Sequence, residues 1–251
     1  MGETLNRARV LLILPAYNEA ANIRSTVEQI LRFQPAGYTL EYLVVNDGSA
    51  DDTERICRES GYPCLTLIQN LGIGGAVQSG YQYARAMGYT AAVQFDGDGQ
   101  HDIRSLDTLL APILAGSADF VVGSRFLNGT SSFRSTVLRR VGIRYLSRLI
   151  ELLSGVRITD PTSGYRAASR RAVDFLADQY PVDYPEPESL VSLLRQGFSV
   201  AEVPVSMFPR KNGRSSIGPR RSIYYMCKVS LAVLCARFER RRIEHVAVSE
   251  S

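Results

Sequence analysis

The stretch AVQFDGDGQH, residues 92–101, joins a short apolar run to two carboxylates that stand two residues apart. Residues 91–95 have the length and composition of a buried strand. Two neighbouring carboxylates are not buried unpaired, because desolvating a charge costs several kcal/mol or more. Asp96 and Asp98 are therefore expected in a loop at the end of this strand, where they reach the surface or hold a cation.

Strands and helices alternate on both sides of this stretch. Apolar runs predict strands at 10–14, 40–47, 64–69, 91–95 and 119–124, and helical spacing predicts helices at 21–33, 52–59, 74–87 and 105–114. Such alternation with short connections predicts an α/β fold, in which helices cover both faces of a mostly parallel sheet. Ligands bind at the carboxyl ends of the strands in these sheets, and a polar loop follows each of the five predicted strands.

The second half of the chain has a different character. An amphipathic helix is expected over 136–153, with Arg140, Arg144 and Arg148 on one face. Its apolar stripe lies on another face and consists of Leu138, Val141, Tyr145, Leu149 and Leu152. An extended segment is expected over 200–208, and further helices over 182–197 and 223–236. The last of these is apolar, lies between basic residues and would be about 21 Å long, too short for a hydrocarbon core of about 30 Å. It is expected to dock on the protein or to lie in a membrane interface. We expect a main domain over 1–210, followed by a basic loop and this helix over 211–251.

Composition and charge narrow the class of protein. A hydrophobic content of 45% with 22% charged residues indicates a folded globular chain rather than a disordered one. The net charge is +4, and arginines concentrate in 124–171 and 207–242, which suits phosphates, nucleic acid or an anionic membrane. The four cysteines have no metal-binding spacing, which indicates reduced thiols. The N-terminal apolar run of 10–14 is shorter than a signal-peptide core, so we expect a cytoplasmic protein.

Six motifs together resemble a known family. In order over 10–166 they are ILPAYNEAANI, VVNDGSADDT, NLGIGGAVQSGYQYA, QFDGDGQH, VGSRF and TDPTSGYRA. The set resembles the family-2 glycosyltransferases, and most of all the dolichyl-phosphate mannose synthase-like branch, whose members use polyprenyl-phosphate acceptors. The resemblance implies a GT-A fold and an inverting transfer of a sugar from a UDP- or GDP-sugar.

The resemblance also implies roles for individual residues. Asp96, Asp98 and Gln100 would hold Mg²⁺ or Mn²⁺, a hard cation that takes oxygen ligands and neutralises a diphosphate leaving group. Gly97 and Gly99 depart from the residues usual in this motif but leave these ligands intact, and His101 is expected to orient the loop. The nucleotide sugar would be bound by Pro15, Tyr17, Glu19, Asp47, Gly72, Gly74, Asp96, Arg125, Arg210 and Ser215, the last two in a segment with Lys211 and Gly213.

Two acceptors remain open at this point. Arg139 and Arg140 occupy the region that receives a lipid phosphate in the resembling branch, and arginine matches phosphate oxygens bidentately. A phosphate arrives ionised and needs no base, whereas a sugar hydroxyl needs a general base, for which Glu186 and Glu188 are the candidates. Polyprenyl phosphate at the inner membrane face is the preferred interpretation, and a lipid-linked or growing saccharide is the alternative.

The same residues bear on how the chain reaches the membrane and on two other classes of protein. The chain either rests on the membrane itself or is recruited by a small membrane protein. A nucleotidyltransferase would show a glycine-rich basic loop after the first strand, where this chain has Pro15-Ala16-Tyr17-Asn18-Glu19. A nucleic-acid-binding module would explain the arginines but not the acidic strand-end loops, so no nucleic acid is expected as a partner. His245, in the polar tail, is expected to be solvated.

Overall fold

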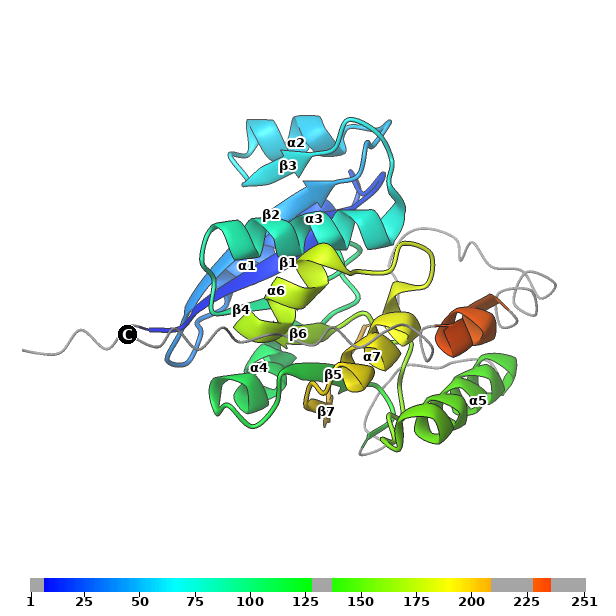
Figure 1. The fold of residues 1–251 in the computed structure, drawn as a ribbon. Helices are drawn as coiled ribbons and strands as arrows, with labels where there is room; N and C mark the ends of the chain where they lie inside the picture. The colour runs from blue at the N-terminus through cyan, green and yellow to red at the C-terminus, as the bar shows by residue number, and fades with distance from the viewer. Residues whose placement is uncertain (1–6, 128–136, 209–227, 236–251) are drawn as a thin grey trace, which may run out of the picture.

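The computed structural model describes residues 7–127, 137–208 and 228–235 of the 251-residue chain (Figure 1). A seven-stranded sheet forms its centre, in the order β3-β2-β1-β4-β6-β5-β7. Its strands are β1 (Arg9–Ala16), β2 (Thr39–Asn46), β3 (Cys64–Thr66), β4 (Ala91–Gln94), β5 (Phe120–Ser124), β6 (Arg166–Ser169) and β7 (Val200–Pro204). Only β6 runs antiparallel to its neighbours in the described sheet, so the expectation of a mostly parallel sheet is confirmed.

Helices cover both faces of the sheet because each strand is apolar on both sides. In β1, Leu11 and Ile13 point to one face while Val10, Leu12 and Leu14 point to the other, and all five are fully buried. The first face is covered by α3 (Gly72–Ala86), α5 (Val137–Ser154), α6 (Arg170–Asp178), α7 (Pro185–Arg195) and a helix over 228–235. The second is covered by α1 (Ile23–Arg32), α2 (Thr53–Glu59), the 3₁₀ turn η1 (Ile103–Ser105) and α4 (Leu106–Leu114).

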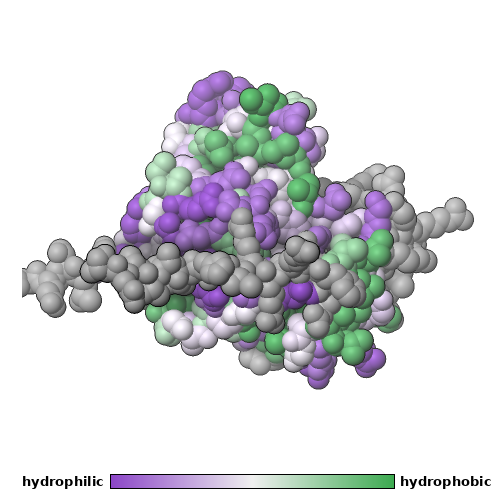
Figure 2. Space-filling model, viewed as in Figure 1, coloured by the Kyte–Doolittle hydropathy of each residue, from purple (hydrophilic) through white to green (hydrophobic). Residues whose placement is uncertain are grey.

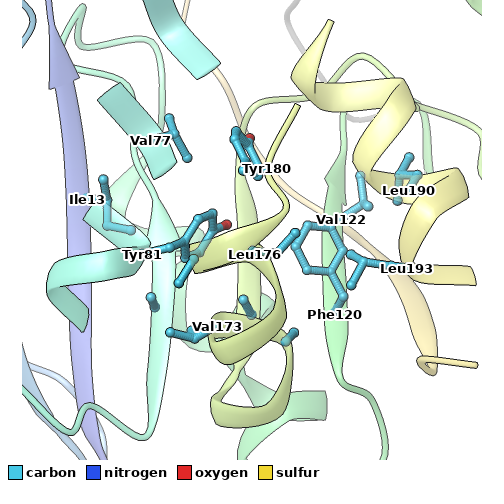
Figure 3. Close-up of a cluster of buried hydrophobic side chains, with 14 of the residues drawn as sticks. Ile13, Val77, Tyr81, Phe120, Val122, Val173, Leu176, Tyr180, Leu190 and Leu193 are labelled. Atoms are coloured by element: carbon cyan, nitrogen blue, oxygen red, sulfur yellow. The ribbon is translucent and has the colours of Figure 1, made fainter. Parts of the chain in front are cut away.

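The core on the first face joins the front and back halves of the chain. Tyr81 of α3, Leu176 of α6 and Leu193 of α7 pack with Phe120 of β5, as Figure 3 shows. The Tyr81 and Tyr180 rings lie 5.4 Å apart between centroids. This packing holds α7, which carries Glu186, against the face of the sheet that includes β5.

The sequence missed one strand and one helix. β6 and α6 follow each other over 166–178, and neither was expected. The β6 segment RAAS is short, starts with an arginine and contains small residues, so it lacks the apolar run that marks the other strands. Inserted between β4 and β5, it brings the TDPTSGYRA motif to the centre of the sheet.

Most of the apolar stripe expected on α5 does not pack on the core, although Leu149 packs against it. Ile143, Leu146 and Ile150 are buried, whereas Val141 and Tyr145 of the expected stripe are exposed. The helix therefore has two apolar sides, of which only one packs on the core. Within the described ranges, no helix has both the length and the hydropathy needed to cross a membrane.

Candidate active site

A cleft of about 460 Å³ opens at the carboxyl ends of β1, β2 and β4. Small-molecule sites occupy roughly 300–1,000 Å³, so this volume fits a ligand of nucleotide size. Four of the five strand-end loops expected to form a site contribute to it, together with the start of α7. The lining residues are Pro15, Ala16, Tyr17, Glu19, Asp47, Asn70, Gly72, Ile73, Ala76, Asp96, Gly97, Asp98 and Glu186.

The loop after β4 brings both aspartates into the cleft. Asp98 accepts two hydrogen bonds from Gln100, at 3.0 Å from the backbone N–H and 2.7 Å from the side-chain amide. A Cβ at Gly97 would lie 3.0 Å from the carbonyl oxygen of Pro15, so glycine lets this loop approach the loop after β1. Gly99 adopts a φ of +74°, a left-handed conformation that also favours glycine.

His101 supports this loop from the protein interior. The backbone N–H of Asp96 donates a 3.0 Å hydrogen bond to His101 Nδ1, and His101 Nε2 lies 3.4 Å from an Asp96 carboxylate oxygen. The ring is 2% exposed and stacks on Tyr165 with 4.5 Å between centroids. Burial lowers the pKa of His101, which favours the neutral ring that can accept from Asp96. The expectation that His101 orients the loop agrees with this geometry.

The loops after β1 and β2 are fixed to each other at one side of the cleft. Asn18 has a φ of 56°, and its side-chain oxygen accepts hydrogen bonds from the N–H groups of Ala50 and Asp51 at 2.9 and 3.3 Å. Glu19 accepts a 2.7 Å hydrogen bond from the side chain of Asn22, which orients its carboxylate. Tyr17 stands at the rim of the cleft with 51% of its surface exposed.

Asp47 and the glycines of α3 close the same side. Asp47 is 2% exposed, and one carboxylate oxygen accepts a 2.7 Å hydrogen bond from the Leu71 N–H, just before α3. Gly72 has a φ of +77°. A Cβ at Gly74 would lie 2.4 Å from the carbonyl oxygen of Pro181, so only glycine permits this approach of α3 to the segment that precedes α7. The cleft lining includes Asp47 and Gly72, whereas Gly74 is not among the lining residues and its expected contact with the nucleotide stays a prediction.

The structure separates the two candidate bases. Glu186 lines the cleft opposite the aspartate loop, whereas Glu188 is not among the lining residues. Burial raises the pKa of Glu186, and the positive charge of Arg166 opposes that rise. A raised pKa suits a carboxylate that accepts a proton, so Glu186 fits the role of a base better than Glu188 does.

Arg125 faces away from the cleft lining and binds Asp160. Its Nε and Nη2 donate 2.7 Å hydrogen bonds to the two carboxylate oxygens of Asp160, and Nη2 also donates to Thr162 at 3.0 Å. Arg125 is 6% exposed and Asp160 is 0% exposed, so this is a buried ion pair. The expected contact of Arg125 with the donor phosphates therefore stays a prediction, which would require this pair to open.

Arg166 is a central residue to which the sequence assigned no role. It is fully buried, and no ion pair to it occurs within the described parts of the chain. Its guanidinium donates to the carbonyl oxygens of Ser163, Glu186 and Pro161 at 2.6, 2.6 and 2.8 Å. The same side chain therefore fixes the loop after Asp160 and the first turn of α7, where Glu186 lies. The sequence signal was present in TDPTSGYRA, but spacing alone does not show which way an arginine points.

The remaining residues singled out in the sequence either are not among the cleft-lining residues or fall outside the described residues. Arg140 is exposed on α5, and Arg139 belongs to the same helix. Arg210, Lys211, Gly213, Ser215 and His245 fall outside the described residues. Their expected roles stay predictions.

Asp96 and Asp98 fit a divalent cation, judged by the chemistry of their donors. Mg²⁺ typically takes one or two carboxylates and completes its shell with water and substrate phosphates. Two carboxylates that line one cleft match that pattern, and the described residues hold no cluster of three or more His, Cys, Asp or Glu that would bind a metal without a substrate. Gln100 binds Asp98 and does not line the cleft, so its amide oxygen as a third ligand stays a prediction.

Solved structures show the same fold. Glucosyl-3-phosphoglycerate synthase from Mycobacterium tuberculosis, crystallised with Mn²⁺, UDP and glucosyl-3-phosphoglycerate, superimposes with a TM-score of 0.66 at 23% identity. The match covers 92% of this chain and 80% of that one. The sheet and the helices that cover it therefore have the GT-A fold.

Sequence comparison gives the family. A family model described as "Glycosyl transferase family 2" matches residues 11–176, and the chain belongs to this family of enzymes. It is 32% identical to a UDP-N-acetylglucosamine–dolichyl-phosphate N-acetylglucosaminyltransferase of Methanococcus voltae, over 78% of this chain and 84% of that one. It is 31% identical to a polyprenol monophosphomannose synthase of Mycolicibacterium smegmatis, over 93% and 90%. An undecaprenyl-phosphate mannosyltransferase of Micrococcus luteus is 29% identical, over 83% and 87%.

Proposed function

We propose that this glycosyltransferase moves a sugar, with inversion, from a UDP- or GDP-sugar to a polyprenyl phosphate at the inner face of the cell membrane. The observation that carries the proposal is the cleft in which Asp96 and Asp98 face Glu19 and Asp47. The relatives described above are named as enzymes that act on dolichyl, polyprenol or undecaprenyl phosphates, which supports this class of acceptor.

The cleft residues divide the work of the reaction. Glu19 and Asp47 bind the nucleoside, since both offer carboxylate oxygens to sugar or base donors and both are held in place by hydrogen bonds. Asp96 and Asp98 would hold Mg²⁺ or Mn²⁺, which supplies charge neutralisation for the departing diphosphate. Gly97 lets the loop approach the loop after β1 closely.

The acceptor phosphate serves as its own nucleophile. A phosphate monoester is ionised near neutral pH, so its oxygen attacks the anomeric carbon from the side opposite the leaving diphosphate, and no proton needs to be removed. Arg139 and Arg140 of α5 are the proposed ligands of that phosphate. This attack from the opposite face accounts for the inversion that we propose, while Asp96 and Asp98 would hold the cation that neutralises the departing diphosphate.

A second candidate acceptor is a saccharide hydroxyl, and the position of Glu186 favours it. Glu186 lines the cleft, and burial raises its pKa, as a general base near the anomeric carbon requires. Under this alternative the acceptor is a lipid-linked or growing saccharide, and Glu186 rather than Glu188 takes its proton.

Metal-dependent binding of UDP and GDP tests the assignment of the site. Titration calorimetry with Mn²⁺ should show binding of one of these nucleotides that EDTA weakens, and Asp98→Asn should weaken it by at least tenfold. Asp178→Asn is the matched control, because Asp178 is half exposed and pairs with Arg85 away from the cleft. Unchanged metal-dependent binding by Asp98→Asn would refute the site.

A further inference from the structure

Two helices present an exposed apolar face on one side of the molecule. The residues that form this α5 face are Val141, Tyr145 and Leu152 of α5 with Leu231 and Leu234 of the helix over 228–235. Their exposed fractions are 56, 50, 82, 63 and 39%. Figure 2 shows hydrophobic side chains gathered over these helices at the lower right. Contiguous apolar surface of this kind marks a site of contact with another molecule or a membrane.

The α5 face is distinct from the side of α5 that packs on the core. Ile143, Leu146 and Ile150 are at most 5% exposed and point into the protein. At 3.6 residues per turn, Val141 and Leu152 fall on the opposite side of the helix. These side chains are therefore not core residues left uncovered at an edge, and no fold requirement explains their apolar character.

The second helix is attached rigidly to α5. Val229 and Val233 are fully buried in the core, which leaves Leu231 and Leu234 directed outwards. The hydroxyl of Ser230 donates a 3.3 Å hydrogen bond to the hydroxyl of Tyr145. One side of this helix therefore docks on the protein, which was one of the two sequence-based alternatives, and the membrane interface stays a prediction for its exposed side.

Charge identifies the occupant of the α5 face as an anionic lipid surface. Arg140, Arg144 and Arg148 are exposed in a row beside the apolar side chains, and α5 carries a single carboxylate, Glu151. Lys228 is exposed on the neighbouring helix. Apolar side chains bordered by arginine and lysine match the boundary between acyl chains and anionic headgroups.

A second copy of this chain fits the α5 face less well. Two-fold association places the same patch of both copies together, which would bring one row of arginines near the other.

We propose that the α5 face is the membrane-docking surface of this enzyme, with Leu152 and Leu231 at the acyl boundary and Arg144 and Arg148 among anionic headgroups. This inference rests on the proposed function, because a polyprenyl-phosphate acceptor lies in a membrane. The inference adds which side chains contact the membrane, and none of these side chains lines the cleft.

Binding of the full-length chain to vesicles tests the proposal independently of catalysis. Vesicles of phosphatidylcholine with and without phosphatidylglycerol are floated with the protein, and binding is measured as a partition coefficient. The natural chain should bind the anionic vesicles. Arg144→Gln/Arg148→Gln should bind about 30-fold more weakly, since each basic residue near such a surface contributes about 1 kcal/mol. Leu152→Ser/Leu231→Ser should also bind at least tenfold more weakly.

Matched controls lie on other faces of the same chain. Leu31→Ser/Met87→Ser removes apolar side chains of 63 and 51% exposure, and Arg24→Gln/Arg58→Gln removes two exposed arginines. Both control pairs should bind vesicles as the natural chain does. Equal binding by all variants, or no binding of the natural chain to anionic vesicles, would overturn the proposal. A dimer in solution that Leu152→Ser/Leu231→Ser converts to monomer would overturn it too and assign the face to a second copy.

A second readout separates this proposal from the proposed function. Transfer to a short-chain, water-soluble prenyl phosphate requires the cleft but no membrane, and Leu152→Ser/Leu231→Ser should leave it unchanged while reducing transfer to acceptor in vesicles at least tenfold. Vesicle binding without transfer to any prenyl phosphate would refute the proposed acceptor and leave the docking surface standing. Equal loss with the soluble acceptor would show that the α5 face serves folding or catalysis instead, and would overturn the docking surface.

Discussion

Replacing Arg125 by methionine distinguishes a structural arginine from one that binds phosphate. The guanidinium makes two 2.7 Å hydrogen bonds to Asp160 and one of 3.0 Å to Thr162. Without it, the partners of the 0% exposed Asp160 carboxylate among the described residues are the Arg125 backbone N–H at 3.2 Å and the Thr162 hydroxyl at 3.3 Å. Arg125→Met therefore leaves a buried charge without its counter-charge.

The expected loss follows from that burial. Removing one partner of a buried ion pair costs about 3–5 kcal/mol, a large part of a total stability of about 5–15 kcal/mol. Each kcal/mol lowers the melting temperature of a protein this large by about 2–4 °C, so Arg125→Met should melt roughly 6–20 °C below the natural chain. Calorimetry or circular dichroism measures this shift.

Two further variants make the test specific. Arg32→Met breaks an ion pair with Glu28 in which the two side chains are 80 and 47% exposed, and should cost no more than about 1 kcal/mol. Arg125→Met/Asp160→Leu removes both charges and should recover most of the loss. A melting temperature of Arg125→Met within about 2 °C of the Arg32→Met value, together with weakened donor binding, would refute the structural role and support the phosphate contact.

Substitutions at three other positions test the packing of the core, the candidate base Glu186 and the hydrogen bonds of Arg166. Gly80→Ala would place a Cβ 2.2 Å from Ile13 Cγ2, so we expect a loss of about 1–3 kcal/mol in urea unfolding, and an unchanged midpoint would contradict the packing of α3 on β1. If Glu186 is a base, activity should fall as its carboxylate takes up a proton, and the acidic limb of the pH–rate profile should lie above the ordinary pKa of 4.5, because burial raises the pKa of Glu186. Glu186→Gln should then abolish transfer to a saccharide, and a fully active Glu186→Gln variant would exclude the role. Arg166→Gln should destabilise the protein by about 3 kcal/mol or more, because three carbonyl oxygens lose their donor at about 1–3 kcal/mol each; Arg166→Lys should recover part of this loss in thermal melts, and equal melting temperatures for Arg166→Gln and the natural chain would show that those hydrogen bonds are not needed.

Much of the front half of the fold could be predicted from local patterns. The strands β1, β2, β4 and β5 are mostly runs of apolar residues, and each is followed by a loop that carries polar residues. Parallel strands place those ends at one edge, so the cleft residues near Asp47 and Asp96 could be predicted together.

The second half shows what local patterns leave out. β6 pairs with both β4 and β5, and its short RAAS segment becomes a strand because two neighbours supply hydrogen bonds that no sequence window contains. The apolar stripe of Val141 and Tyr145 has helical spacing, but spacing does not show which of two stripes meets the core. The pairing of Arg125 with Asp160 likewise depends on contact across 35 positions of sequence.

The most direct test of the central claim follows a labelled sugar. Purified protein with Mg²⁺ or Mn²⁺ is incubated with radiolabelled UDP- and GDP-sugars and undecaprenyl phosphate in detergent, and the organic phase is counted. The account predicts that label from one of these donors enters the organic phase, and that Asp98→Ala abolishes this transfer. Donor hydrolysis by the natural chain with no label in the organic phase would contradict the polyprenyl-phosphate acceptor, and full transfer by Asp98→Ala would contradict the site.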